Sequence, residues 1–428
     1  MIQLAQILFI LSVLVILHEF GHYIVGRWSG IHADVFSLGF GPVLFSRFDK
    51  RGTKWQVAAL PFGGYVKFRG DADPASASAQ NMDHQSEEFK RSTMVGAPLW
   101  ARSATVFAGP LFNFLFSIAL FAGILLYQGT TKLPLTVSQI EPVPFDHTMQ
   151  VGDVLIEVEG NSLRDGQDGF SDLPKSQTLS YVVERNERLV EVTGPSAELA
   201  RVVQVMPRSA AAEAGLQEGD VIVTANAQDI TVFSDLKTIV EGSDGAPIDL
   251  AIWRDGVMQQ LVLTPKRVDE QRPDGSFAKY WRIGIVGGTF PFEFETETAP
   301  VTQAFGNATQ MTYEIMKGSL TGLYHVITGA ISSCNLSGPI GIAETSGQMA
   351  RQGSLDFLWF IAILSTAVGF INLFPIPILD GGHLSLYAWE AVAGKPPSER
   401  ILNRIMTVGL FIVLSFMIFA VTNDLFCP

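Results

Sequence analysis

The sequence is short of cysteine and of charge. Its 428 residues include two cysteines, Cys334 and Cys427, which are too few for a disulfide scaffold or a cysteine-rich structural zinc site. Charged residues make up 17% of the chain, against about 25% in soluble domains. The net charge is −13 and the chain lacks a basic stripe. This argues against a nucleic-acid partner, because phosphate binding requires clustered positive charge.

Long apolar runs take the place of charge. Hydrophobic residues make up 47% of the chain, and four runs approach the roughly 20 residues that cross a bilayer. They cover residues 2–25, 104–127, 357–379 and 405–421. The first run lacks a basic amino-terminal region and a small-residue cleavage site, so we interpret it as a retained span rather than a signal peptide. Four buried helices in one soluble chain are the disfavoured alternative.

The distribution of Lys and Arg predicts the orientation of these spans. Basic residues cluster between the first and second runs and recur between the third and fourth, whereas none precedes Arg27 and none follows Val421. Short loops rich in Lys and Arg stay in the cytoplasm. We therefore expect both of these links in the cytoplasm, and both termini and the long segment from about 130 to 356 outside.

Two regions outside the spans have a β pattern. Residues 54–58 and 60–68 alternate in polarity around Gly63-Gly64, which predicts a hairpin or short sheet. In the external segment, Val-Gly-Asp-Val at 151–154 recurs as Glu-Gly-Asp-Val at 218–221, which indicates two tandem β-rich units. The second unit carries an Ala-rich string that ends in Gly215-Leu216 and resembles bacterial PDZ domains, whereas the first unit lacks it. Residues 301–330 favour a helix that lies on the membrane or packs on the protein.

The strongest chemical signal is the string His18-Glu19-Phe20-Gly21-His22 inside the first span. Two histidines four residues apart share one helix face, so both imidazoles can reach one metal ion. Glu19 lies about 100° around the helix and can accept a proton from a metal-bound water. Ionisable groups in a span are costly unless they are paired, metal-bound or functional. A satisfied histidine pair in a helix bundle is the alternative interpretation.

A catalytic zinc ion usually has three protein ligands and one open position. Asp380, at the cytoplasmic end of the third run, is the candidate third ligand, and His383 is its rival. A helix-end residue beside Gly381-Gly382 is the alternative role for Asp380. Pro375 and Pro377 interrupt helical hydrogen bonding just before it and would open the span. Asn372 can bind a peptide or an oxyanion there, or it can stabilise the kink.

These residues together resemble a known family. The histidine motif, Asn372 to Gly382, Gly109-Pro110 with Asn113, and the PDZ-like pair are similar to bacterial site-2 proteases, most closely the regulator-of-sigma-E protease group. The strings at 62–67 and 335–340 are also similar to that group. The resemblance implies an intramembrane zinc endopeptidase with one Zn²⁺ per chain, held by His18, His22 and Asp380, and with Glu19 as the catalytic base.

The resemblance also implies partners and a location. It implies a bacterial inner-membrane protein with periplasmic termini and with periplasmic PDZ domains that act as a size filter. Substrates would be single-span membrane proteins, such as an anti-sigma factor already trimmed outside, and remnant signal peptides. An extended substrate would lie beside the hairpin at Tyr65 and Val66, near Asn372, Pro375 and Pro377. Peptide C-termini can bind the second PDZ-like unit near Gly215 and Leu216, and a β-module that only acts as a scaffold is the alternative.

We therefore expect an α-helical membrane protein with four transmembrane helices, a cytoplasmic membrane-associated β-hairpin or sheet, and two external PDZ-like α+β domains. The expected order is span one with the zinc motif (1–27), a cytoplasmic loop with the hairpin (28–103), span two (104–127), a degenerate PDZ-like domain (130–200), a second one (201–266), a strand with amphipathic helices (267–356), span three with the third ligand (357–380), a cytoplasmic link (381–404) and span four (405–422).

Two other functions fit parts of the sequence. A membrane-anchored PDZ adaptor or chaperone with a non-catalytic metal site would keep the spans and the external units. An intact set of His18, Glu19, His22 and Asp380 argues against it. A metal-dependent transporter fits poorly with four spans and a long external insert.

Overall fold

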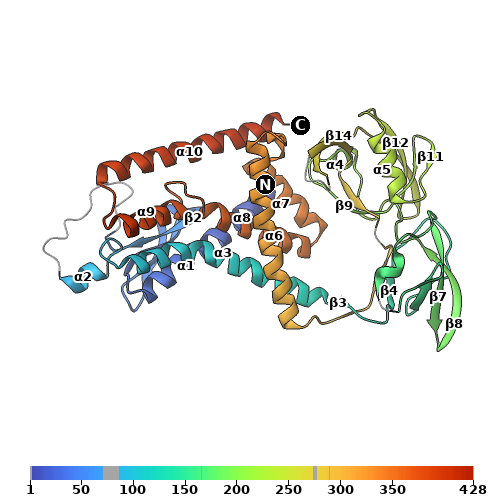
Figure 1. The fold of residues 1–428 in the computed structure, drawn as a ribbon, viewed down its shortest axis with the longest axis horizontal. Helices are drawn as coiled ribbons and strands as arrows, with labels where there is room; N and C mark the ends of the chain where they lie inside the picture. The colour runs from blue at the N-terminus through green and yellow to red at the C-terminus, as the bar shows by residue number, and fades with distance from the viewer. Residues whose placement is uncertain (1, 71–85, 165, 273–276, 289, 428) are drawn as a thin grey trace. The chain divides into compact units, whose positions relative to one another are not determined.

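A computed structural model describes residues 2–70, 86–164, 166–272, 277–288 and 290–427. The chain forms two compact units (Figure 1). The helical unit comprises Met1–Ile124, Val301–Thr328 and Ser333–Pro428. The strand-rich unit comprises Leu125–Pro300 and Gly329–Ser332. Residues 71–85 of the expected cytoplasmic loop (28–103) lie outside the described residues.

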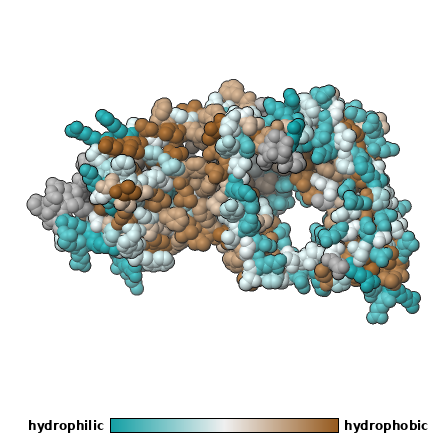
Figure 2. Space-filling model, viewed as in Figure 1, coloured by the Kyte–Doolittle hydropathy of each residue, from teal (hydrophilic) through white to brown (hydrophobic). Residues whose placement is uncertain are grey.

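Four helices of the helical unit are long and apolar enough to cross a membrane, as the sequence predicts. They are α1 (Ile2–Trp28), α3 (Leu99–Gln128), α8 (Ser354–Asn372) and α10 (Glu399–Phe426). On the face shown in Figure 2, hydrophobic side chains gather over the helical unit. The second and fourth of these helices begin earlier than expected, at Leu99 and Glu399. The third ends earlier than expected, because α8 ends at Asn372 and not near Asp380. Pro375 and Pro377 explain this early end, since proline cannot continue a helix.

Four shorter or more polar helices complete this unit. They are α2 (Glu87–Arg91), α6 (Val301–Ile327), α7 (Pro339–Gln352) and α9 (Asp380–Ala393). The predicted helix after residue 300 is α6, which packs on α8 and buries small side chains such as Ala304 and Ala308. Helix α9 begins at Asp380, so the candidate third ligand lies at the start of a new helix.

The predicted hairpin consists of two long, bent strands. Strand β1 (Ala33–Phe48) pairs antiparallel with β2 (Lys54–Phe68). The first part of β1 lies between both ends of β2, since Phe36 pairs with Trp55 on one side and with Val66 on the other. Phe36 stacks on Trp55 with ring centroids 4.3 Å apart, and Tyr23 of α1 contacts both rings. These aromatic contacts fix the hairpin against α1 and leave residues 64–68 as an edge of the sheet.

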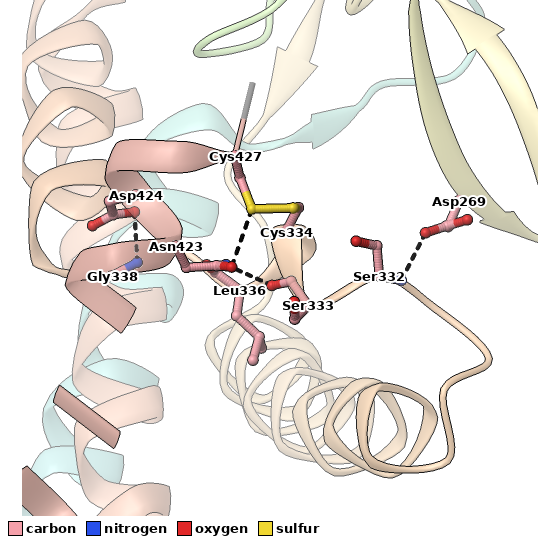
Figure 3. The surroundings of a disulfide bond; sticks show 9 residues. All are labelled: Asp269, Ser332, Ser333, Cys334, Leu336, Gly338, Asn423, Asp424 and Cys427. Atoms are coloured by element: carbon pink, nitrogen blue, oxygen red, sulfur yellow. Dashed lines mark hydrogen bonds between the residues drawn. A yellow bond between two sulfur atoms is a disulfide. The ribbon is translucent and has the colours of Figure 1, made fainter. Parts of the chain in front are cut away.

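The far end of α10 is attached to the segment before α7 (Figure 3). Cys334 and Cys427 form a disulfide across 93 residues of sequence, a pairing that the sequence pattern did not predict. The Asp424 carboxylate accepts hydrogen bonds from the backbone N–H groups of Gly338 and Ile340, both at 2.9 Å. It thereby satisfies the free donors at the start of α7. The Asn423 side chain adds bonds to two backbone carbonyls of the same segment.

The strand-rich unit contains two modules with the same sheet order. Module 1 has the sheet β6-β5-β7-β8, and module 2 has β11-β10-β12-β13. In module 1 these are β5 (Val154–Val158), β6 (Asn161–Ser162), β7 (Thr178–Arg185) and β8 (Arg188–Pro195). In module 2 they are β10 (Val221–Ala225), β11 (Gln228–Asp229), β12 (Ile248–Arg254) and β13 (Val257–Leu263).

A repeated ion pair explains the repeated Gly-Asp string. The Asp153 carboxylate is bonded to the Arg185 guanidinium at 2.6 and 2.7 Å, and Asp220 is bonded to Arg254 at the same two distances. Both aspartates are buried, and buried carboxylates require such partners. The Asp220 hydrogen bonds also raise the pKa of the Arg254 guanidinium above its usual value. Each string therefore places one internal charge pair in its module.

Strands that come after both sheets in the sequence complete the two modules. Strand β16 (Ile285–Gly287) pairs with β9 (Val202–Val205) of module 2, and β17 (Phe292–Phe294) pairs with β4 (Val137–Ile140) of module 1. Module 2 therefore extends beyond residue 266, and module 1 includes a strand that follows module 2 in sequence. Short non-local strands leave no periodic signal of their own, so sequence alone placed both module ends too early.

The strand-rich unit has further features outside the two sheets. Module 2 carries the helices α4 (Ala210–Ala214) and α5 (Phe233–Glu241), whereas the described part of module 1 has the short 3₁₀ helix η1 (Gln167–Phe170). A hairpin of β14 (Lys266–Gln271) and β15 (Phe277–Arg282) follows β13. Strands β3 (Thr130–Thr131) and β18 (Thr296–Glu297) pair at the two ends of the unit.

Candidate metal centre

The candidate centre lies where α1 and α3 approach most closely. Gly109 of α3 faces the two histidines of α1, and a Cβ atom there would overlap the His22 imidazole and come within 2.8 Å of His18 Cε1. Gly21 of α1 lies against the Ala108 carbonyl in the same way. Small residues allow such close packing of helices in a membrane. The space for both imidazoles therefore depends on a missing side chain at position 109.

Three ionisable side chains converge at this point. His18 Nε2 lies 3.0 Å from Asp380 Oδ2, and His22 Nε2 lies 3.5 Å from Asp380 Oδ1. The two Nε2 atoms are 3.1 Å apart. One ligand atom from each of the three residues lies within 4.8 Å of the others. All three side chains are buried or nearly so.

This donor set fits a zinc ion. Two ligands about 2.0–2.1 Å from zinc and at a tetrahedral angle lie about 3.3 Å apart, close to the 3.1 Å between the imidazole nitrogens. Asp380 Oδ2 lies 3.0 Å from His18 Nε2 but is buried without a hydrogen bond of regular geometry among the described residues. A buried carboxylate oxygen that faces two imidazoles in this way fits the role of a metal ligand.

The outer nitrogens of both imidazoles have partners. His22 Nδ1 lies 2.8 Å from the Thr105 carbonyl oxygen, and His18 Nδ1 lies 3.4 Å from the Asn113 side-chain amide. An imidazole that binds a metal through Nε2 carries its proton on Nδ1 and needs an acceptor there. Asn113 Oδ1 is buried without a partner. A rotation of this side-chain amide by about 180° would turn its oxygen toward His18 Nδ1, where it can accept a hydrogen bond.

The turn before α9 positions Asp380. The chain leaves α8 at Asn372 and folds back over the start of α9, where a Cβ at Gly381 would overlap the carbonyl oxygens of Leu373 and Phe374. Ile378 has a φ angle of 87°, which is unfavourable for a β-branched residue. Strain of this kind occurs where surrounding structure fixes a functional group. Here the turn holds the carboxylate at the level of the histidines.

Glu19 lies beside the three candidate ligands and contacts the hairpin. Its Oε2 accepts a hydrogen bond of 3.0 Å from the backbone N–H of Val66. Val66 pairs with Phe36 in the sheet, and its N–H is bonded to Glu19 and not to β1. The edge strand therefore orients the candidate base.

A cavity of about 450 Å³ surrounds these groups. Of the residues singled out from the sequence, it contains Tyr65, Val66 and Asn372 together with the candidate ligands and Glu19, whereas Pro375 and Pro377 do not line it. His383 also lines the cavity, but the cluster of candidate ligands among the described residues contains Asp380 in its place. Asn372 Nδ2 donates to the Val368 carbonyl at 3.1 Å, so this amide also supports the end of α8.

Gly215 and Leu216 lie in module 2. Gly215 ends α4 with a φ angle of 80°, and its carbonyl accepts a hydrogen bond from Arg254. Leu216 is buried in the core of module 2. Neither residue lines the groove between α5 and β16 of this module.

Sequence reasoning gave no role to Thr105, Asn113 or Gly109, although Gly109 and Asn113 carry part of the family resemblance. Thr105 acts through its backbone carbonyl, which no side-chain pattern can reveal. Gly109 acts by leaving space, and only the neighbouring helix shows what fills that space. The Arg102–Glu390 ion pair at 2.6 Å, which joins α3 to α9, links residues 288 positions apart in sequence.

The chain is similar to known metalloproteases over nearly its whole length. The model of peptidase family M50 matches residues 6–416. A protein of Rhizobium meliloti, named as a zinc metalloprotease, is 34% identical over 98% of this chain and 95% of its own. The metalloprotease MmpA of Caulobacter vibrioides is 32% identical over 99% and 96%, respectively. The regulator of sigma-E protease RseP of Salmonella typhimurium is 32% identical over 99% and 98%.

One solved structure resembles a part of the chain. It is a PDZ domain of an SdrC-like protein from Listeria monocytogenes, with 15% identity and a TM-score of 0.18, and it covers 21% of this chain and 87% of its own. At that TM-score the likeness carries no argument about either module.

We predict that Gly109→Ala removes the bound metal. The added methyl group would occupy the space of the His22 imidazole, so metal affinity should fall by at least about tenfold, as it does when ligand orientation is lost. Gly123→Ala is the matched control on the same helix, because a Cβ there meets nothing within 4 Å. Elemental analysis of the purified proteins measures the effect. Equal metal content in both variants would contradict the close approach at Gly109.

Proposed function

Since the chain belongs to peptidase family M50 and is an inner-membrane metalloprotease, we propose that it cuts single-span membrane proteins at or within the bilayer. One zinc ion would be held by His18, His22 and Asp380, with Glu19 as the base. The observation that carries this proposal is the convergence of two imidazole nitrogens and a carboxylate beside Glu19. Such a set at membrane depth is costly without a functional role.

The residues around the centre have separate roles in peptide hydrolysis. The chemistry that zinc would supply there is a lowered pKa of water and polarisation of the scissile carbonyl. The Glu19 carboxylate would take the proton of the attacking water and pass it to the leaving amine nitrogen. The Val66 N–H fixes the direction of the Glu19 carboxylate. The Thr105 carbonyl fixes the orientation of the His22 imidazole through Nδ1. The Asn113 side-chain amide contacts Nδ1 of the His18 imidazole.

The hairpin edge provides a place for the substrate chain. A transmembrane helix hides its carbonyls in its own hydrogen bonds, so it must unwind before attack. Addition of the unwound strand to the edge at Tyr65 and Val66 would replace the lost bonds. Asn372 lines the same cavity and is available to the substrate backbone. Pro375 and Pro377 end α8 early. Backbone groups near the candidate metal centre would therefore lie outside a helix and be free to bind the substrate chain.

We infer the substrate class from the relatives and the external modules. One relative is named regulator of sigma-E protease, which favours an anti-sigma factor already trimmed outside, in an envelope stress response. Remnant signal peptides have the same single-span form. The two modules, which we interpret as PDZ-like, would exclude bulky external domains by size, and module 2 would bind peptide C-termini.

The orientation proposed from Lys and Arg gains support from the disulfide. Cys427 lies at the end of α10 and pairs with Cys334 before α7. Disulfides persist in oxidising compartments such as the bacterial periplasm. With a periplasmic C-terminus, this end of α10 would lie outside. In the same orientation, the histidine motif would lie toward the cytoplasmic end of α1, and Asp380 would follow the cytoplasmic end of α8.

The first test concerns metal and activity together. Wild-type protein should contain about one zinc per chain, and His22→Ala and Asp380→Ala should lose it. Glu19→Gln should keep zinc but lose about 10²- to 10⁴-fold in cleavage rate, because the base is gone. Asp356→Asn, an acid in the first turn of α8, is the control that should keep both. Zinc analysis and cleavage of a model single-span substrate are measured side by side. Cleavage by Glu19→Gln at the wild-type rate would sink the proposal.

The second test concerns topology. In a variant without Cys334 and Cys427, a single cysteine at Arg51, in the turn between β1 and β2, should react only from the cytoplasmic side. A cysteine at Asp229, exposed in module 2, should react only from outside. Impermeant thiol reagents on intact and permeabilised cells measure this. Labelling of both positions from one side would contradict the orientation.

The third test concerns the modules as a size filter. Thr131 pairs with Thr296, and the Lys132 N–H donates to the Glu295 carbonyl, so a short glycine-serine turn can replace residues 132–295. We predict that this deletion remains active and cuts a substrate with a large external domain, which the intact protein spares. A clash between folded domains blocks entry more completely than one peptide contact can.

Cleavage of full-length and pre-trimmed substrate in membranes measures the effect of the deletion. The deletion combined with Glu19→Gln is the background control and should cut neither substrate. If the deletion variant cuts the trimmed substrate and still spares the full-length one, the size filter is wrong. Point changes near Gly215 and Leu216 should change the choice of substrate much less than the deletion does.

A further inference from the structure

Module 2 contains a groove between α5 and the strand β16. The groove has a volume of about 260 Å³. Its apolar wall is formed by Phe233, Leu236 and Val240 of α5 and by Ile283 and Ile285 across from them. Toward the far end of β16 the groove narrows, because a Cβ at Gly287 would lie 2.5 Å from the Phe233 ring. The open end therefore lies toward Arg282, which precedes the strand.

One edge of β16 is available within this groove. Among the described residues, β16 belongs to a two-stranded sheet with β9, so its other edge carries no strand. An open edge beside apolar helical side chains is the arrangement that binds an extended peptide by strand addition. The strand covers Ile285–Gly287, which suits a few residues of ligand at about 3.3 Å each.

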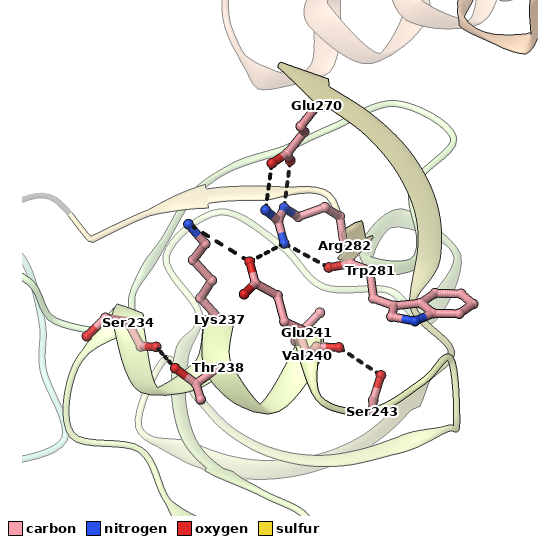
Figure 4. A network of polar contacts seen from close by, with 9 residues as sticks. All are labelled: Ser234, Lys237, Thr238, Val240, Glu241, Ser243, Glu270, Trp281 and Arg282. Atoms are coloured by element: carbon pink, nitrogen blue, oxygen red, sulfur yellow. Dashed lines mark hydrogen bonds and ion pairs between the residues drawn. The ribbon is translucent and has the colours of Figure 1, made fainter. Parts of the chain in front are cut away.

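Arg282 at the open end is already bound to carboxylates (Figure 4). Its Nε and Nη2 each lie 2.6 Å from an oxygen of Glu270, which is the two-point geometry that arginine makes with a carboxylate. Its Nη1 lies 2.6 Å from Glu241 and 3.0 Å from the Trp281 carbonyl. Most of its five N–H donors are therefore occupied.

The two glutamates differ in where they lie. Glu241 belongs to α5 and also lies 4.0 Å from Lys237 Nζ, so it is shared between two cations, and it does not line the groove. Glu270 belongs to the β14–β15 hairpin, its side chain is 41% exposed, and it lines the groove. Glu270 is therefore the carboxylate whose place on Arg282 a ligand in the groove would take.

We propose that Glu270 is a built-in competitor that closes the groove of module 2 to peptide C-termini. This proposal deepens the proposed role of module 2 as a peptide binder. The ligand is a peptide with apolar last side chains and a free terminal carboxylate. Its last residues pair with β16, its side chains contact Phe233, Leu236 and Val240, and its carboxylate takes the place of Glu270 on Arg282.

Charge balance explains why a carboxylate is the required group. With Glu270 in place, the charges of Lys237, Arg282, Glu241 and Glu270 cancel at this end of the groove. When Glu270 turns into solvent, one positive charge is left uncompensated beside an apolar wall. A peptide terminus restores the balance, whereas an uncharged amide terminus does not. The same exchange makes the groove selective for free C-termini over internal segments.

The test measures peptide binding by the full-length protein and not its cleavage. The Glu19→Gln background is used throughout, so that a bound peptide is not turned over and a failure of the protease proposal does not affect the result. The probe is a fluorescein-labelled eight-residue peptide that ends in Leu-Ile-Val with a free carboxylate. The same peptide with a C-terminal amide is the second probe, and fluorescence anisotropy is the measurement.

We expect Glu270→Gln to bind the acid peptide about tenfold more tightly than the parent. This is the gain in affinity if Glu270 closes about nine-tenths of the grooves in the parent protein, because only the open fraction binds peptide. The amide peptide should bind weakly to both. Glu213→Gln is the matched control, because Glu213 forms an exposed ion pair with Lys266 in the same module and lies outside the groove. It should bind like the parent. The double change Glu270→Gln and Arg282→Gln should cancel the gain.

Each other outcome overturns part of the proposal. Equal affinity of the parent and Glu270→Gln for the acid peptide would show that Glu270 does not compete. Equal binding of the acid and amide peptides to Glu270→Gln would remove the carboxylate from recognition. Failure of Glu270→Gln to bind either peptide, in protein whose modules resist protease as the parent does, would rule out this ligand class.

Discussion

The burial of two imidazoles and a carboxylate at membrane depth is the constraint on which the helical unit depends. Such groups are costly in an apolar span unless they satisfy one another or bind a metal. Their convergence requires space, which Gly109 provides, and it requires Asp380 at the level of the α1 histidines. The early end of α8, the strained Ile378 and the fold-back over Gly381 meet this second requirement.

The second constraint couples the hairpin to the chemistry. The candidate base and the sheet edge share one group, since the Val66 N–H binds the Glu19 carboxylate. The hairpin is in turn fixed to α1 by aromatic contacts of Tyr23 and by the Arg27–Asp49 ion pair at 2.9 Å. The helix that carries the motif therefore also holds the strand that orients Glu19. A substrate strand at this edge would lie within the same cavity as the candidate ligands.

The strand-rich unit shows how duplicated modules diverge. Both keep the sheet order and the buried Asp–Arg pair, because loss of either partner leaves an uncompensated buried charge. They differ at the groove, where module 2 has α5 and module 1 has only a short 3₁₀ helix in its described part. The β14–β15 hairpin adds a carboxylate to the groove of module 2. The two modules thus share their internal charge pair and differ at the surface beside the sheet.

Sequence alone determined the features that depend on local pattern. Four apolar runs, the histidine pair on one helix face, the hairpin and the duplicated Gly-Asp string all follow from composition and spacing. Only the tertiary structure decided which distant residues meet. It brought Asp380, the candidate from the sequence, and not its rival His383 to the histidines. It also joined Asn113 to His18, Val66 to Glu19, Cys334 to Cys427, and β17 to module 1. The physical reason is that hydrogen bonds, ion pairs and close packing depend on positions in space, and the residues that make them here are separated by up to hundreds of positions along the chain.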